Sequence, residues 1–124
     1  MIDASFMLAA ILPDERHQYA EEVIQKYIDG TCVLLVPSVF PFEVANGIKM
    51  AIVRKRLTSP AAKEILKKCR ELNIPIEDTD IIKVFSLAIK SDLSIYDASY
   101  VALAQTKNIP LLTLDSKMKK LTEK

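Results

Sequence analysis

Residues 95–115 read IYDASYVALAQTKNIPLLTLD, and this stretch decides the fold class. Its first part, Ile95 to Lys107, is predicted to be a helix, and the nearly unbroken apolar residues after Asp97 indicate that this helix is buried. Its second part, Pro110 to Leu114, is an apolar run of strand length that ends directly at Asp115. A buried helix that leads into a short apolar strand is typical of an α/β domain.

The same alternation continues toward the N-terminus. The apolar, β-prone run Cys32–Val36 predicts a strand buried on both faces, and Met1–Asp3 and Pro75–Glu77 are predicted to be further short strands. Helical patterns lie between and after these strands, at Ser5–Leu12, Tyr19–Ile28, Ser38–Arg56, Ser59–Leu72, Asp80–Lys90, Ile95–Lys107 and Lys117–Lys124. Strands separated by helices predict a parallel sheet flanked by helices on both faces, and therefore an α/β fold.

Local signals mark where two of these helices begin or end. Gly30 follows the helix predicted to end at Ile28 and is expected to serve as its C-cap. Ser38 is expected to cap the helix that runs to Arg56, in which Pro41 is tolerated because it lies in the first turn.

The overall composition limits the classes of function. The chain has 124 residues, which predicts a single domain over residues 1–124. Its formal net charge of +1 is too small to indicate nucleic-acid binding, so any site for a polyanion must be a local patch. The apolar N-terminal run, Phe6–Leu12, lacks a basic leading region and is too short to cross a bilayer. We therefore expect a cytoplasmic protein without a membrane segment.

A zinc site has no ligand set in this sequence. Cys32 and Cys69 are the two cysteines and are far apart, and His17 is the single histidine. We expect both thiols to be reduced and buried, and His17 to lie at the surface.

Four acidic residues fall where a parallel sheet gathers its ligand-binding residues. Asp3 and Asp115 end the first and last predicted strands, and Glu43 and Asp97 lie in the early turns of two predicted helices. The carboxyl ends of parallel strands form the binding crevice of an open sheet. The sequence therefore predicts that carboxylates from distant parts of the chain meet at one edge.

Clustered carboxylates indicate a cation. Their mutual repulsion and loss of hydration would drive protonation unless a positive ion neutralises them. Ligands that are all oxygen favour Mg²⁺ or Mn²⁺ over zinc. Such an ion can activate water and stabilise the transition state of a phosphoryl displacement, which predicts a metal-dependent nuclease.

At these acids the chain resembles the PIN-domain family, and in particular its single-domain VapC-like toxins. The matching pieces are Ile2-Asp3-Ala4-Ser5, Pro37-Ser38 with Glu43-Val44-Ala45-Asn46, Tyr96-Asp97-Ala98-Ser99-Tyr100-Val101-Ala102-Leu103-Ala104, and Leu112-Thr113-Leu114-Asp115. Each motif alone is a weak signal for the family, but the four motifs in this order on an α/β fold are specific for it. The resemblance implies a PIN-like three-layer fold and a Mg²⁺-dependent endoribonuclease, with Mn²⁺ as the alternative ion. It also implies an RNA substrate, an antitoxin partner and a homodimer.

The resemblance also assigns roles by position. Asp3 and Asp97 look like the direct metal ligands, and Glu43 and Asp115 complete the catalytic cluster directly or through water. Three further residues look like supports for these acids. They are the hydroxyls of Ser5 and Thr113 and the amide of Asn46, one turn after Glu43. The chain departs from many relatives in having little sequence after Asp115, where they add another strand.

Simpler interpretations remain open for each residue alone. Asp3 or Asp115 could cap a helix, Asp97 could serve the helix dipole, and Glu43 could be solvated. Their joint occurrence favours the site. A PIN-like module that binds RNA or protein without catalysis is the alternative to the enzyme, and a DNA-cutting relative is a weaker third option.

Two surfaces are candidates for macromolecular contacts. Basic residues near Asp115 could bind RNA phosphates, or simply form a solvated face; they are Lys117, Lys119 and Lys120. Apolar residues of the helix after Ser38 could form a groove for a helix of the partner, although core packing is the simpler interpretation. They are Phe40, Phe42, Ile48, Met50, Ile52 and Val53.

Overall fold

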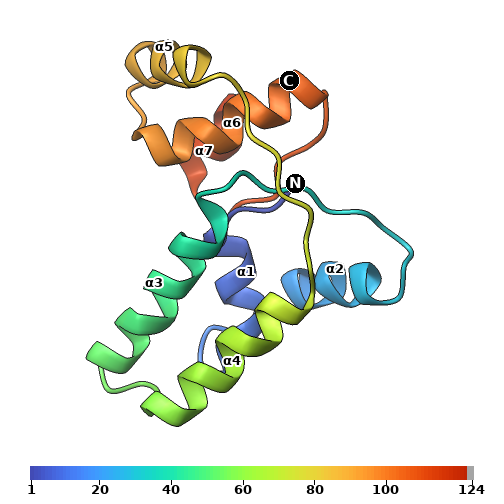
Figure 1. Cartoon of the computed structure of the whole chain (residues 1–124), viewed down its shortest axis with the longest axis vertical. Helices are drawn as coiled ribbons and strands as arrows, with labels where there is room; N and C mark the ends of the chain where they lie inside the picture. Colours follow the sequence, from blue (N-terminus) through green and yellow to red (C-terminus); the bar gives the residue numbers. More distant parts are fainter. Residues whose placement is uncertain (123–124) are drawn as a thin grey trace.

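The computed structural model describes residues 1–122 and arranges them around helices joined by short extended segments (Figure 1). The helices are α1 (Ala4–Ile11), α2 (Gln18–Ile28), α3 (Phe40–Val53), α4 (Ser59–Glu71), α5 (Ile81–Ser91), α6 (Ile95–Lys107) and α7 (Ser116–Thr122). Each predicted helix is present, with bounds that differ by at most three residues where the structure describes them. The last two residues of the predicted tail helix, 123 and 124, lie outside the described part of the chain.

Of the two predicted helix caps, one is confirmed and one is wrong. Gly30 has a φ of 76° and donates its backbone N–H to the carbonyl of Tyr27, as expected of a glycine that ends a helix. Ser38 does not cap α3, because the helix begins at Phe40 and its N-cap residue is Val39, which makes no side-chain capping bond. The backbone N–H of Ser38 instead donates to Oδ1 of Asp78, at 2.8 Å.

The predicted strands are reduced to two isolated parallel bridges. Ile2 pairs with Leu112, and Val36 pairs with Ile76. Each bridge has backbone hydrogen bonds on both sides, such as Leu112 N–H to the Met1 carbonyl at 2.8 Å. No longer strand is defined within residues 1–122. The parallel direction agrees with the prediction, and a continuous sheet flanked by helices stays a prediction.

The segment Cys32–Val36 differs from the expectation of burial on both faces. Leu34 and Val36 are buried, but the side chain of Val33 is 91% exposed. The part of the segment from Leu34 to Val36 reaches the core, and the bridge to Ile76 lies at its last residue, Val36.

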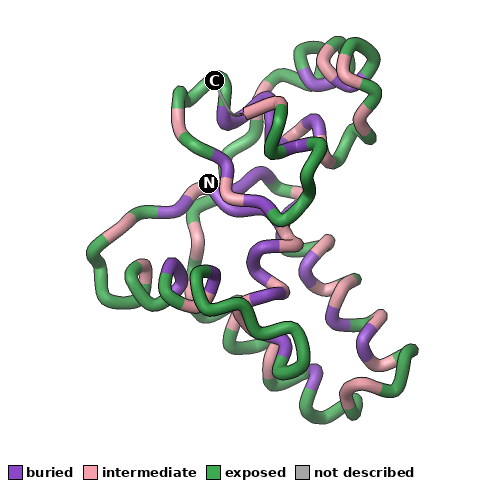
Figure 2. The backbone as a smooth tube through the Cα atoms, turned by 180° about the vertical axis from the view of Figure 1, so that it is seen from behind, coloured by how far each residue is buried: buried purple, intermediate pink, exposed green. Residues whose placement is uncertain are grey.

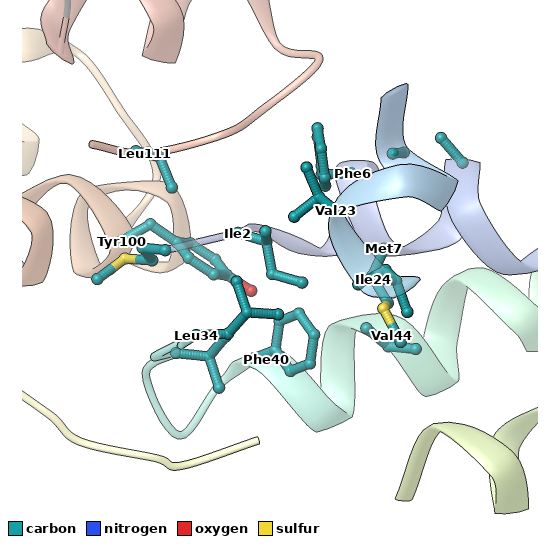
Figure 3. Close-up of a cluster of buried hydrophobic side chains, with 14 of the residues drawn as sticks. Ile2, Phe6, Met7, Val23, Ile24, Leu34, Phe40, Val44, Tyr100 and Leu111 are labelled. Carbon is teal, nitrogen blue, oxygen red and sulfur yellow. The ribbon is translucent and has the colours of Figure 1, made fainter. Parts of the chain in front are cut away.

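The core lies where the two bridged segments meet α1, α3 and α6. Figure 3 shows Ile2, Phe6, Phe40 and Tyr100 directed toward a shared interior, and each of these side chains is buried. Figure 2 shows the buried positions following the central segments and the inner faces of the helices. The central segments therefore carry the residues that fix the helices relative to one another.

The helices pack in two groups on either side of these central segments (Figure 1). α1 contacts α2 and α3, and α3 contacts α4, whereas α5 and α7 both contact α6. α1 and α3 approach closely at Gly47, where a Cβ would require the Leu8 side chain to move. The site described below lies where α3 of one group faces α6 of the other.

No helix among residues 1–122 combines the length and the hydropathy that crossing a membrane requires.

Candidate active site

Asp3 is the most deeply buried of the four predicted acids, with 4% of its surface exposed. It follows the bridged residue Ile2 and is the N-cap of α1. Its Oδ1 accepts hydrogen bonds from the Phe6 N–H at 3.0 Å and the Ser5 hydroxyl at 2.7 Å. Its Oδ2 accepts from the Thr113 hydroxyl. A carboxylate at this depth needs such partners, because burying an unpaired charge is costly.

Thr113 connects Asp3 to the fourth acid. The Thr113 hydroxyl donates to Asp3 and accepts from the backbone N–H of Asp115, at 2.9 Å. Asp115 in turn accepts the N–H of Met118 at 2.9 Å, at the start of α7. The parallel bridge between Ile2 and Leu112 places these residues side by side, since each follows its bridged neighbour by one to three positions. Asp3 and Asp115 therefore both cap helices and both belong to one hydrogen-bonded network.

Glu43 lies in the first turn of α3 and is half-buried. Its pKa is raised above 4.5, primarily because burial penalises the charged form. The nearby Tyr100 hydroxyl opposes this rise, and the negative charges of Asp97 and Asp3 add to it. Glu43 is therefore close enough to both aspartates for their charges to act on it.

Asp97 lies in the first turn of α6, where its backbone N–H donates to the capping Ser94 hydroxyl at 3.0 Å. Its pKa is raised above 3.8, first by burial and then by the charges of Asp115 and Asp3. Ser94 and the cation of Lys117 act in the opposite direction. Asp97 is thus electrostatically coupled to acids from both ends of the chain.

These couplings join all four predicted acids into one negatively charged cluster. Two of the three predicted supporting residues, Ser5 and Thr113, contact Asp3 directly. Asn46 is exposed on α3 and lies outside the hydrogen-bonded network around Asp3. A pocket of about 290 Å³ lies between the segment before α3, the start of α5 and the start of α6; it is lined by residues such as Val39, Ile81 and Tyr96 and by none of the four acids.

The donor chemistry of this cluster fits a hard divalent cation. Among residues 1–122, no three His, Cys, Asp or Glu side chains are arranged as a ready-made ligand group. Such a group is not required for Mg²⁺, which commonly uses one or two carboxylates and keeps several waters. The carboxylates with raised pKa values are the groups whose ionisation a bound cation would favour.

Sequence reasoning gave no role to Tyr100, although its hydroxyl lies beside Glu43. The available signal was its spacing, since a residue three positions after Asp97 lies on the same face of α6. That spacing alone does not separate a site residue from an ordinary core aromatic.

Comparisons with known proteins identify the family of the chain. The chain is 30% identical over 122 residues to "Ribonuclease VapC3" of Pyrobaculum aerophilum, which covers 95% of this chain and 90% of that protein. It is 32% identical over 120 residues to "Ribonuclease VapC9" of Mycobacterium tuberculosis, covering 95% and 87%. The crystal structure of PAE2754 from Pyrobaculum aerophilum has a similar fold, with a TM-score of 0.75 and 24% identity over 98% of this chain and 84% of that one. The family model for the PIN domain matches residues 1–124, so the resemblance found in the sequence is confirmed and the chain belongs to the PIN-domain family.

Proposed function

We propose that this protein is a Mg²⁺-dependent endoribonuclease that cleaves RNA phosphodiester bonds and acts as the toxin of a type II toxin–antitoxin pair. The observation that carries the proposal is the coupling of four carboxylates from separate parts of the chain. Burial and mutual repulsion raise the pKa values of Glu43 and Asp97, an arrangement that costs stability without a cation. Such unfavourable electrostatics are typical of functional sites.

In this proposal Asp3 and Asp97 bind the metal directly, and Glu43 and Asp115 act directly or through water. A bound Mg²⁺ would activate a water molecule and stabilise the charge that develops on the phosphate. Asp3 suits a direct role, because Ser5 and Thr113 fix its two oxygens in place while they remain able to accept further contacts. Mn²⁺ has the same oxygen preference and would be an alternative ion.

RNA is the proposed substrate because the relatives that match over most of the chain are named ribonucleases. A local basic surface is available next to the acids, on α7. Lys117 is paired with Asp92, whereas the side chains of Lys119 and Lys120 are exposed. We propose that these two lysines bind RNA phosphates close to the acidic cluster.

A cleavage assay with Asp97→Asn tests the catalytic proposal. We expect wild type to cut single-stranded RNA when Mg²⁺ is added and to stop when it is chelated, and Asp97→Asn to lose at least about 100-fold in rate. Asp29→Asn, an exposed change at the end of α2, is the matched control and should retain full activity. Equal cleavage by wild type and Asp97→Asn would defeat the metal assignment, and cleavage by neither would favour the non-catalytic binding module.

The antitoxin is the proposed protein partner, and α3 offers part of the surface for it. Phe42 and Val53 are 77% and 59% exposed, so two of the six predicted groove residues face solvent. Phe40 and Ile48 are buried, which agrees with the simpler interpretation of core packing for them. Co-expression with the small protein encoded beside this gene tests the partner. We expect the two to co-purify and Phe42→Asp to release the complex, while sedimentation of the isolated chain tests the proposed homodimer.

A further inference from the structure

Tyr100 carries the one buried side-chain polar atom that finds no hydrogen-bond partner within residues 1–122. Only 1% of the residue is exposed, so water does not replace the missing partner at the surface. Leaving a buried donor unpaired costs stability, and such groups are rare in native proteins and call for an explanation. A phenylalanine would fill the same space in the core without this cost. The hydroxyl therefore needs a role outside packing.

The position of Tyr100 indicates what the hydroxyl serves. Tyr100 lies one turn after Asp97 on the same face of α6, and Figure 3 shows its ring extending from this helix toward Ile2 and Phe40. Those two residues directly adjoin the acidic cluster, since Ile2 precedes Asp3 and Phe40 begins α3, which carries Glu43. The ring therefore extends toward the segments that carry Asp3 and Glu43.

The hydroxyl lies close to the Glu43 carboxylate without forming a hydrogen bond to it. It acts to lower the pKa of Glu43. The pKa of Tyr100 is raised above its ordinary value of 10, first by burial, then by the interaction with Glu43 and by the charges of Glu43 and Asp3. Toward a negatively charged neighbour such as the Glu43 carboxylate, a tyrosine hydroxyl acts only as a hydrogen-bond donor. Glu43 is the neighbouring acceptor, and its carboxylate is half-buried.

We infer that Tyr100 is a positioning residue, whose buried hydroxyl donates a hydrogen bond to Glu43 when a divalent ion is bound and so fixes the orientation of that carboxylate. The inference rests on the proposed function and extends it to a residue that does not touch substrate or ion. Such a donor fixes the orientation of the carboxylate and favours its charged form. The hydroxyl is unpaired and costs stability in the metal-free protein, and it has the Glu43 carboxylate as its partner in the metal-bound protein.

Tyr100→Phe tests this inference, because it removes the hydroxyl and keeps the ring. We expect the melting temperature of the metal-free variant to be unchanged or higher, since an unpaired buried group is removed. We expect Mn²⁺ binding, followed by electron paramagnetic resonance in the absence of RNA, to weaken by about 10-fold or more. In cleavage assays kcat should fall by about 10–100-fold, with an unchanged KM for RNA.

Tyr27→Phe is the matched control. The Tyr27 hydroxyl donates to the carbonyls of Leu72 and Asn73, so its removal should lower the melting temperature and leave Mn²⁺ binding and kcat at wild-type values. In a Glu43→Gln background, Tyr100→Phe should have no further effect on Mn²⁺ binding, because the carboxylate that the hydroxyl serves is already gone.

The outcomes separate this inference from the proposed function. If the wild-type protein neither binds Mn²⁺ nor cleaves RNA, both the proposed function and the role of Tyr100 are contradicted. If wild type does both and Tyr100→Phe matches it in Mn²⁺ affinity and kcat, only the inference is overturned. A Tyr100→Phe variant with a lower melting temperature and wild-type Mn²⁺ affinity would likewise overturn it, by assigning the hydroxyl a purely structural role.

Discussion

The Thr113 hydroxyl donates a hydrogen bond to Oδ2 of Asp3 across 110 positions of the sequence. Both residues are almost fully buried, at 3% and 4% exposure. They follow the bridged pair Ile2 and Leu112 directly, so the pairing of the two segments and the orientation of Asp3 arise together. The acidic cluster therefore forms only when the first and last extended segments of the fold are in register.

Thr113→Val is expected to damage both stability and activity. The change removes a hydrogen bond to a buried carboxylate and the acceptor for the Asp115 N–H, with little change in volume. Hydrogen bonds to charged groups contribute about 1.5–3 kcal/mol, so urea denaturation should show a loss of about 2 kcal/mol in the free energy of unfolding. RNA cleavage should fall by about 10–100-fold as Asp3 loses its orientation.

Thr31→Val is the control for this change. Thr31 is exposed in the turn after α2, and its hydroxyl donates to the Lys26 carbonyl far from the acids. It should cleave RNA at the wild-type rate. Wild-type cleavage by Thr113→Val would instead mean that the hydroxyl does not orient Asp3 for catalysis.

Asp97→Asn should stabilise the metal-free protein in a pH-dependent way. The pKa of Asp97 is raised above 3.8 by folding, so the native state binds its proton more tightly than the unfolded state does. The contribution of this group to stability is therefore highest at low pH and is lost as pH rises from 3.8 through the raised value. Denaturation in EDTA should show equal stability of the two proteins near pH 3.5 and a more stable Asp97→Asn at pH 7. A difference that is the same at every pH would contradict the raised pKa.

Mg²⁺ should stabilise the wild-type protein at neutral pH. A ligand that binds only the folded state at a hundredfold excess over its Kd adds about 2.7 kcal/mol to the free energy of unfolding. The gain should vanish near pH 4, where protons compete for Glu43 and Asp97, and it should be much smaller for Asp97→Asn. Thermal melts with Mg²⁺ and with KCl of the same ionic strength distinguish specific binding from general screening, and equal shifts by both salts would contradict a metal site.

Lys119→Ala combined with Lys120→Ala should make RNA binding less dependent on salt. Each phosphate contact to a single strand contributes about 0.7 to the slope of log K against log salt, so the double variant should lower that slope by about 1.4. Binding is measured in EDTA, which prevents cleavage. Lys26→Ala with Lys63→Ala removes the same charge from exposed positions on α2 and α4 and should leave the slope unchanged. An unchanged slope for the α7 pair would assign those lysines to a solvated face.

The helices could be predicted from the sequence because their hydrogen bonds join residues four positions apart. The apolar pattern of residues 95–107 and the glycine after Ile28 are local signals, and α6 and the end of α2 lie where they indicate. The start of α3 was predicted less well. Ser38 has the residue type of a cap, but its N–H is bound by Asp78, which lies 40 positions away.

The sequence by itself determined the family, the helices and the positions of the four acids at element ends. Tertiary structure decided the rest. It placed Val33 in solvent, paired Ile2 with Leu112, and brought the Tyr100 hydroxyl close to Glu43. The reason is the sequence separation of the interacting residues. Helix caps and the apolar pattern of a helix depend on residues that are neighbours along the chain. Burial and charge coupling depend instead on distances between elements, which exist only once all of them have packed.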